Sequence, residues 1–177
     1  KRGVLAGTRS VLRGDGTIGP CISRYHQGTV RDIIEIYEGT NFKVNSLSFT
    51  ATEAKHSDPF SVGLRINTAN GNIGYTSDTG YFPGLAESYN DIRLLIICTM
   101  WPRNNPIKIH LNTDEALMLI EESRPKACLL SHFGMRMIRA GPEKEAEYLR
   151  EQTGIPVYAA TDGLRVSLKD AITLKGP

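Results

Sequence analysis

The chain has 177 residues, of which 40% are hydrophobic and 23% are charged, a composition typical of one folded, water-soluble domain and unlike that of a disordered or fibrous protein. Its 21 Lys and Arg residues nearly balance 19 Asp and Glu residues, and the formal net charge of +2 neither favours nor excludes nucleic acid as a partner. Apolar runs such as 94–98 are far shorter than the roughly 20 residues that cross a membrane, so no membrane partner is expected.

The N-terminal part of the sequence predicts short β-strands. Residues 1–32 are rich in glycine and show no sustained hydrophobic period, although 3–6 fit a short strand. Two clearer strands are expected at 33–37 and 42–50, because both segments are rich in residues that favour β-structure. The segment 38–41, Glu-Gly-Thr-Asn, fits a turn between them.

A β-hairpin is predicted next. Residues 62–68 alternate between apolar and polar side chains, which is the pattern of a strand with one buried face. Asn70 and Gly71 tolerate the positive φ of a tight turn, and 73–75 form the returning strand.

In the second half of the chain the hydrophobic period lengthens, which predicts strands alternating with helices. Asn112 and Glu115 form a capping-box pattern ahead of a helix that ends before Pro125, and Gly154 fits the end of a second helix. The expected elements are strands at 94–99, 127–131, 157–160 and 164–168, the last two around a turn at 161–163, and a helix at 143–153. The order of elements predicts an α/β fold.

Three cysteines, Cys21, Cys98 and Cys128, form no C-x-x-C pair and leave an odd thiol, which is typical of a reducing compartment. Cys98 and Cys128 lie in apolar runs, where we expect buried, unreactive thiols. We therefore predict a cytoplasmic protein.

Three side chains of metal-ligand type follow predicted strands. His132 comes directly after the strand at 127–131, Asp78 follows the hairpin, and His56 follows the strand that ends near residue 50. These side chains can converge if their strands end at one edge of a sheet. Two imidazoles and a carboxylate are a donor set typical of Zn²⁺ or a neighbouring transition metal, although each histidine taken alone is more often an ordinary loop residue.

The short sequence segments around these residues resemble those of the metallo-β-lactamase superfamily. The blocks, in order, are Ala54-Lys55-His56-Ser57-Asp58-Pro59, Ser77-Asp78-Thr79, Ser131-His132-Phe133-Gly134 and Thr161-Asp162-Gly163. The resemblance covers roughly 42–168 and implies an α/β fold of the αββα sandwich type over a single domain, 1–177. It also implies that His56, Asp78 and His132 are metal ligands, with Asp78 bridging.

The family's first metal motif, H-x-H-x-D-H, does not occur in the 177 residues. We therefore expect the chain to be the later, C-terminal part of a longer protein, which on its own binds metal weakly or at one site and is inactive. The resemblance implies that the full-length protein is a metal-dependent hydrolase, which uses a metal-bound hydroxide on an ester, amide or phosphoester. One or two Zn²⁺ ions are expected, with Fe or Mn as alternatives.

Two further residues acquire roles from the resemblance. His110 precedes the predicted helix. Nucleases of the tRNA 3′-end processing type carry a similar histidine near the scissile phosphate, so the resemblance makes His110 a candidate catalytic residue. The alternative is that His110 is a solvent-facing loop residue. Asp162 is first of all a turn residue. The resemblance adds a second role, in which its carboxylate orients a metal-bound histidine.

Other functions are weighed against the hydrolase. A nucleic-acid phosphodiesterase of the same fold is favoured by His110 and by five arginines within residues 1–32, and a non-catalytic module retaining the fold is a second alternative. The D-T-G triplet at 78–80 is also found in aspartic proteases, but it has no second copy here.

A chain lacking part of its fold exposes apolar surface, so a homodimer is expected. The small-molecule or phosphoester substrate is not specified, although the loop 100–106 fits its rim.

Overall fold

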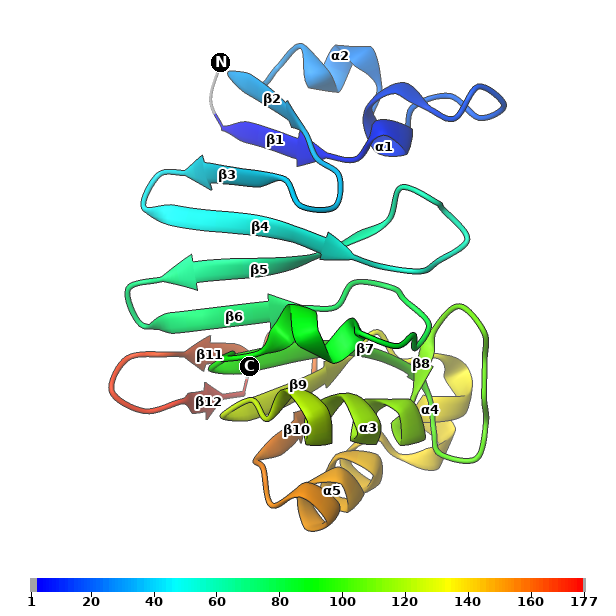
Figure 1. The fold of residues 1–177 in the computed structure, drawn as a ribbon, viewed down its shortest axis with the longest axis vertical. Helices are drawn as coiled ribbons and strands as arrows, with labels where there is room; N and C mark the ends of the chain where they lie inside the picture. The colour runs from blue at the N-terminus through cyan, green and yellow to red at the C-terminus, as the bar shows by residue number, and fades with distance from the viewer. Residues whose placement is uncertain (1–2, 177) are drawn as a thin grey trace.

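A computed structural model describes residues 3–176. Its main feature is a mixed eight-stranded sheet with the order β10-β9-β7-β6-β5-β4-β3, in which β8 pairs with β7 off this path (Figure 1). The strands are β3 (Asn41–Val44), β4 (Leu47–Glu53), β5 (Val62–Thr68), β6 (Gly71–Tyr75), β7 (Leu94–Trp101), β8 (Leu111–Asn112), β9 (Ala127–Ser131) and β10 (Val157–Ala159). Strands β3 to β6 are antiparallel, whereas β6, β7, β9 and β10 run parallel. Consequently β4, β6, β7 and β9 all end at the same edge of the sheet.

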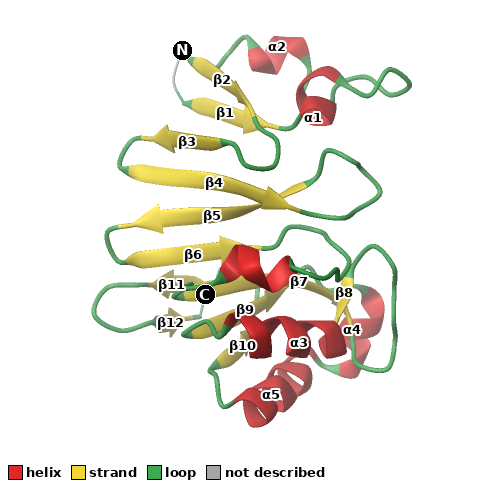
Figure 2. Ribbon diagram, viewed as in Figure 1, coloured by secondary structure: helices red, strands yellow, loops and turns green. Residues whose placement is uncertain are grey.

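Helices cover one face of the parallel part of this sheet (Figure 2). They are the 3-10 helix η1 (Leu85–Tyr89), α3 (Thr113–Ser123), α4 (Met135–Ala140) and α5 (Pro142–Thr153). Leu95 of β7 and Leu130 of β9 are fully buried in one core with Leu119 of α3 and Leu149 of α5. Burying such leucines stabilises the fold by roughly 2 kcal/mol each. Within residues 3–176 every helix is too short or too polar to span a membrane.

The other face of the same strands is covered by a small antiparallel ribbon of β11 (Arg165–Ser167) and β12 (Thr173–Lys175). Leu94 and Leu129 are buried there against Val166 and Leu174 of the ribbon. Strands β7 and β9 are thus buried on both faces, which explains why their sequences are continuous apolar runs. Further along this face, Phe49 of β4 and its cross-strand partner Ile66 of β5 are only half-buried.

A separate N-terminal unit consists of β1 (Val4–Gly7), α1 (Arg9–Arg13), α2 (Arg24–Gln27) and β2 (Asp32–Glu35). Strands β1 and β2 pair in parallel. The short strand expected at 3–6 is therefore confirmed by β1, one residue later, while α1 and α2 were not predicted because residues 9–27 lack a helical hydrophobic period.

Several local predictions are confirmed. The Asn112 side chain accepts a hydrogen bond from the Glu115 N–H at 2.9 Å, and the Glu115 carboxylate accepts one from the Asn112 N–H at 3.0 Å, so the capping box forms. Gly71 opens β6 with φ +102°, and Gly154 ends α5 with φ +69°. Cys98 and Cys128 are buried, and burial raises the pKa of both thiols, as expected for unreactive cysteines.

Three strand predictions were wrong, the first in the extent of a strand and the other two in the pairing. Residues 42–50 do not form one strand, because Asn45 adopts φ +54° and folds the segment into the β3–β4 hairpin. Strand β2, expected beside that segment, pairs with β1 instead. The strands at 157–160 and 164–168 were expected to form a pair around the turn at 161–163, yet β10 joins the main sheet and β11 pairs with β12. The last two errors concern the choice of partner, which local patterns do not encode.

Candidate metal centre

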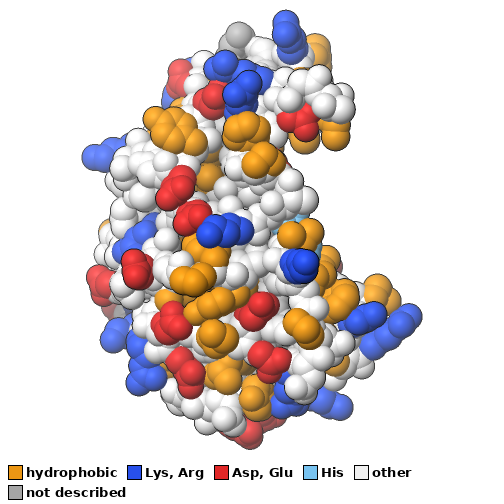
Figure 3. All heavy atoms as spheres, turned by 45° about the vertical axis from the view of Figure 1, so that its right-hand side comes forward, with side chains coloured by type: hydrophobic (Ala, Val, Ile, Leu, Met, Phe, Trp, Pro, Cys, Tyr) orange, Lys and Arg blue, Asp and Glu red, His pale blue; other side chains and the backbone are white. Residues whose placement is uncertain are grey.

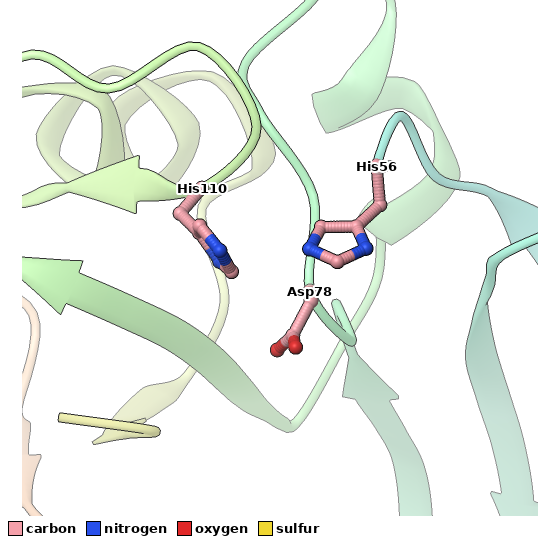
Figure 4. Close-up of side chains that lie close together, drawn as sticks. All are labelled: His56, Asp78 and His110. Atoms are coloured by element: carbon pink, nitrogen blue, oxygen red, sulfur yellow. The ribbon is translucent and has the colours of Figure 1, made fainter. Parts of the chain in front are cut away.

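Four loops meet at the sheet edge where β4, β6 and β9 end. His56 lies beyond β4, Asp78 beyond β6 and His132 directly beyond β9, while His110 lies just before β8. Figure 4 shows the His56, Asp78 and His110 side chains pointing toward one another. One ligand atom of each of these three lies within 4.8 Å of the others. Parallel strands deliver the loops after them to one edge, and the sheet order therefore explains the convergence.

His132 joins this group through Asp78. Its Nε2 lies 3.3 Å from Asp78 Oδ1, and its ring centroid lies 5.7 Å from that of His110. His132 adopts φ +60°, a backbone conformation that is uncommon for residues other than glycine. This conformation turns the chain sharply at the end of β9. The structure thus brings together His56, Asp78 and His132, the predicted ligands, although their roles as ligands stay a prediction.

Two nitrogen atoms in this cluster are buried without hydrogen-bond partners among the described residues. They are His56 Nε2 and His110 Nδ1, and the His56 and His110 ring centroids are 4.9 Å apart. A buried polar atom without a partner typically costs about 1–3 kcal/mol. Coordination of a cation would satisfy such nitrogens, and imidazole nitrogens with a carboxylate suit Zn²⁺, Fe²⁺ and Mn²⁺ alike. The residues present therefore fit a metal ion.

The environment of His110 disfavours its protonated form. Burial lowers the pKa of His110 below its ordinary value of 6.5. The rings of His56 and His132 lower this pKa further, whereas the carboxylate of Asp78 opposes the shift. At neutral pH the ring is thus mainly neutral, which leaves a nitrogen lone pair available. It would become a proton donor when an anionic group lies beside it and raises its pKa again.

This shift predicts a pH-dependent stability for the metal-free protein. The unfolded chain binds a proton at His110 near pH 6.5, whereas the folded chain takes it up only at lower pH. The free energy of unfolding should therefore decrease as the pH falls below about 6.5. Denaturant unfolding at pH 7.5 and 5.5 measures this difference, which His110→Gln should reduce. An unchanged difference in His110→Gln would contradict the prediction.

Asp162 lies in the exposed turn where the Leu164 N–H donates to the Thr161 carbonyl at 3.0 Å. The turn interpretation is thus confirmed. No hydrogen bond joins Asp162 to His132, although both line an open hollow of about 500 Å³. The orienting role of Asp162 stays a prediction.

The loop expected to form the rim, 100–106, begins within β7, which continues to Trp101. Arg103 points to Glu145 of α5, with 3.3 Å between Nε and Oε1, and its guanidinium lies 4.2 Å from the Tyr148 ring centroid. Glu145 also accepts from the Arg103 N–H and is 4% exposed, which the charged sequence of α5 did not reveal. Arg103 therefore anchors the loop to α5.

A second hollow opens on the His56 side of the centre, with a volume of about 540 Å³. Tyr37, Lys55, His56 and Phe60 are among its lining residues. Figure 3 shows this side of the molecule hollowed between the N-terminal unit and the helical part, with histidine atoms at the base. Of the four clustered side chains, His56 is the one that lines this hollow.

Comparisons with known proteins support this architecture. The family profile of the β-lactamase superfamily domain matches residues 4–133. An uncharacterised protein of Methanocaldococcus jannaschii is 38% identical over 170 residues, which are 95% of this chain and 63% of the relative. The chain thus spans less than two thirds of the length of that relative.

Solved structures share the fold at low sequence identity. The metallo-β-lactamase fold protein YhfI of Bacillus subtilis has a TM-score of 0.72 at 17% identity, over 90% of this chain and 63% of that protein. Zn²⁺-bound PqqB of Methylobacterium extorquens has a TM-score of 0.67 at 13% identity, over 93% and 64%. A diphosphatase of the PhnP family has a TM-score of 0.66 at 17% identity, over 93% and 58%.

The predicted α/β fold of the metallo-β-lactamase type is therefore confirmed. The family match starts at residue 4, so the N-terminal unit, which lies outside the range 42–168 of the sequence resemblance, is part of it. With the fold, the family profile and the relative in agreement, the chain belongs to the β-lactamase superfamily.

Proposed function

We propose that the protein is a metal-dependent hydrolase whose centre contains His56, Asp78 and His132 as ligands. The observation that supports this proposal is the buried His56 Nε2, which has no hydrogen-bond partner among the described residues and belongs to a side chain that meets the Asp78 carboxylate at the sheet edge. A bound divalent cation would polarise the substrate and lower the pKa of a coordinated water toward about 7. Zn²⁺ is the ion we expect, with Fe²⁺ and Mn²⁺ as alternatives.

Each residue has a distinct part in the proposal. A ligand atom of Asp78 lies within 4.8 Å of one of His56, and Asp78 Oδ1 lies 3.3 Å from His132 Nε2, so its carboxylate would help to hold a cation on either side. His132 Nε2 lies 3.3 Å from Asp78 Oδ1, and the His132 side chain is 41% exposed. A second cation would require further donors, such as the H-x-H-x-D-H motif that the 177 residues lack. We therefore propose activity with two cations only for a longer protein that supplies these donors, such as one of the length of the Methanocaldococcus relative.

A phosphoester is the substrate class that suits His110 best. Its lowered pKa keeps the ring neutral until an anionic group approaches, and a phosphoryl group supplies that charge where a neutral ester does not. The protonated ring would then donate to the leaving oxygen. The structural likeness to a diphosphatase of the PhnP family supports the same substrate class.

Nucleic acid is less favoured as the substrate. Two arginines of the N-terminal unit are neutralised within the chain, Arg13 by Glu35 and Arg31 by Asp32, each at 2.6 Å. Such pairs reduce the positive charge available to phosphates. The phosphodiesterase acting on nucleic acid therefore remains the alternative.

The test combines metal binding with hydrolysis. The intact protein is stripped of metal, titrated with Zn²⁺, Mn²⁺ or Fe²⁺, and assayed on bis(p-nitrophenyl) phosphate, p-nitrophenyl phosphate and p-nitrophenyl acetate. We expect metal to restore phosphoester hydrolysis and a chelator to abolish it. Hydrolysis that persists without metal would refute the proposal, and metal binding without any hydrolysis would favour the non-catalytic module.

A further inference from the structure

Thr79 and Gly80, which follow Asp78, lie against the loop that carries His56. The Thr79 hydroxyl oxygen accepts a hydrogen bond from the Lys55 N–H at 2.9 Å, and the Gly80 N–H donates to the Lys55 carbonyl at 2.8 Å. Both backbone groups of the residue before His56 are thus bound by the two residues after Asp78. Thr79 is completely buried, and its hydroxyl donates to the Gly80 carbonyl at 2.8 Å.

Gly80 also lies against the loop that carries His110. A Cβ atom at Gly80 would lie 2.2 Å from the Lys108 carbonyl oxygen and 3.5 Å from Ile109 Cα. A separation of 2.2 Å is well below van der Waals contact, and the atom approached is backbone, so any larger residue would push this loop away. Only glycine permits the segment before His110 to pass so close to residue 80.

We propose that Thr79 and Gly80 are positioning residues, which set the distances between Asp78 and the loops of His56 and His110. The inference rests on the proposed function, because it assigns these contacts to the metal centre. Ligands must be held within about 0.5 Å of their productive positions, and loops do so only when their backbones are fixed. The hydrogen bonds to Lys55 fix the His56 loop before any cation binds.

A buried threonine whose hydroxyl contacts none of the loops of the centre is available for comparison. The Thr52 hydroxyl lies 2.9 Å from the Tyr89 hydroxyl and is 6% exposed, but its partner belongs to η1 and not to any of the loops of the centre. Thr52→Val and Thr79→Val each remove one buried hydroxyl while keeping the shape of the side chain. Only the second should alter the metal centre.

The experiment measures Zn²⁺ affinity by competition with a chelator, together with the melting temperature of the metal-free protein. We expect Thr79→Val to raise the Kd for Zn²⁺ by about 10–100-fold, the range typical for loss of a residue that supports a ligand. Thr79→Ser, which keeps the hydroxyl, should restore most of the affinity. Thr52→Val should lower the melting temperature and leave the Kd unchanged.

Gly80→Ala provides a second measurement through the other loop. In this variant, displacement of the segment 108–109 should lower turnover at saturating Zn²⁺. Gly80→Ala also keeps the inference testable if Thr79→Val does not fold. Unchanged Zn²⁺ affinity in Thr79→Val, or an equal loss of Zn²⁺ affinity in Thr52→Val, would overturn this inference but not the proposed function. Absence of Zn²⁺ binding by the wild-type protein would overturn the proposed function and the inference together.

Discussion

Asp78→Ala is expected to abolish hydrolysis and to reduce the amount of bound metal. Asp78 supplies the only carboxylate in the cluster with His56 and His110, and its Oδ1 also lies 3.3 Å from His132 Nε2. Without it, cations in the centre lose the negative charge that offsets their mutual repulsion, and His132 loses its partner. We expect turnover to fall by more than about 10²-fold, since loss of a supporting residue alone typically costs 10–100-fold.

The measurement is metal content by mass spectrometry, alongside turnover of bis(p-nitrophenyl) phosphate by the intact protein. Asp78→Asn serves as a matched variant, because it keeps the shape and removes the charge. Asp170→Ala removes an exposed carboxylate elsewhere and should change neither quantity. Full metal content and full activity in Asp78→Ala would refute the assignment of this residue.

His110→Ala is expected to retain the metal and to lower turnover by about 10²-fold or more, the range typical for loss of a general acid. Because the variant lacks the donor to the leaving oxygen, its loss of activity should be largest for esters with a poor leaving group. It should be smaller for p-nitrophenyl esters, whose leaving group departs without a proton. Turnover of both classes and metal content are measured in the same preparations.

The same variant distinguishes two roles for His110. One of its ring nitrogens lies within 4.8 Å of the ligand atoms of His56 and Asp78, close enough for a shared cation. Loss of bound metal in His110→Ala would show that the residue is a ligand and not the acid. His26→Ala, on the exposed surface of α2, is the control for removal of a histidine.

Local patterns in the sequence were sufficient for most of the parallel part of the fold. The apolar runs predicted β7 and β9, and the pair Asn112 and Glu115 predicted the start of α3, because both signals depend on residues close together in the chain. The three candidate ligands were also found from sequence, since each follows a strand. The identity of strand partners was not predicted, as the β3–β4 hairpin and the β11–β12 ribbon demonstrate.

By itself, the sequence predicted the family, the alternation of strands and helices in the second half of the chain, and the residues with metal-binding chemistry at strand ends. The tertiary structure alone decided that His110 lies within ligand distance of Asp78, that Glu145 is buried against Arg103, and that Thr79 binds the backbone of Lys55. The last contact joins residues 24 positions apart. Such contacts depend on which strands lie side by side, and strand order follows from burial of the whole sheet and not from any local run of residues.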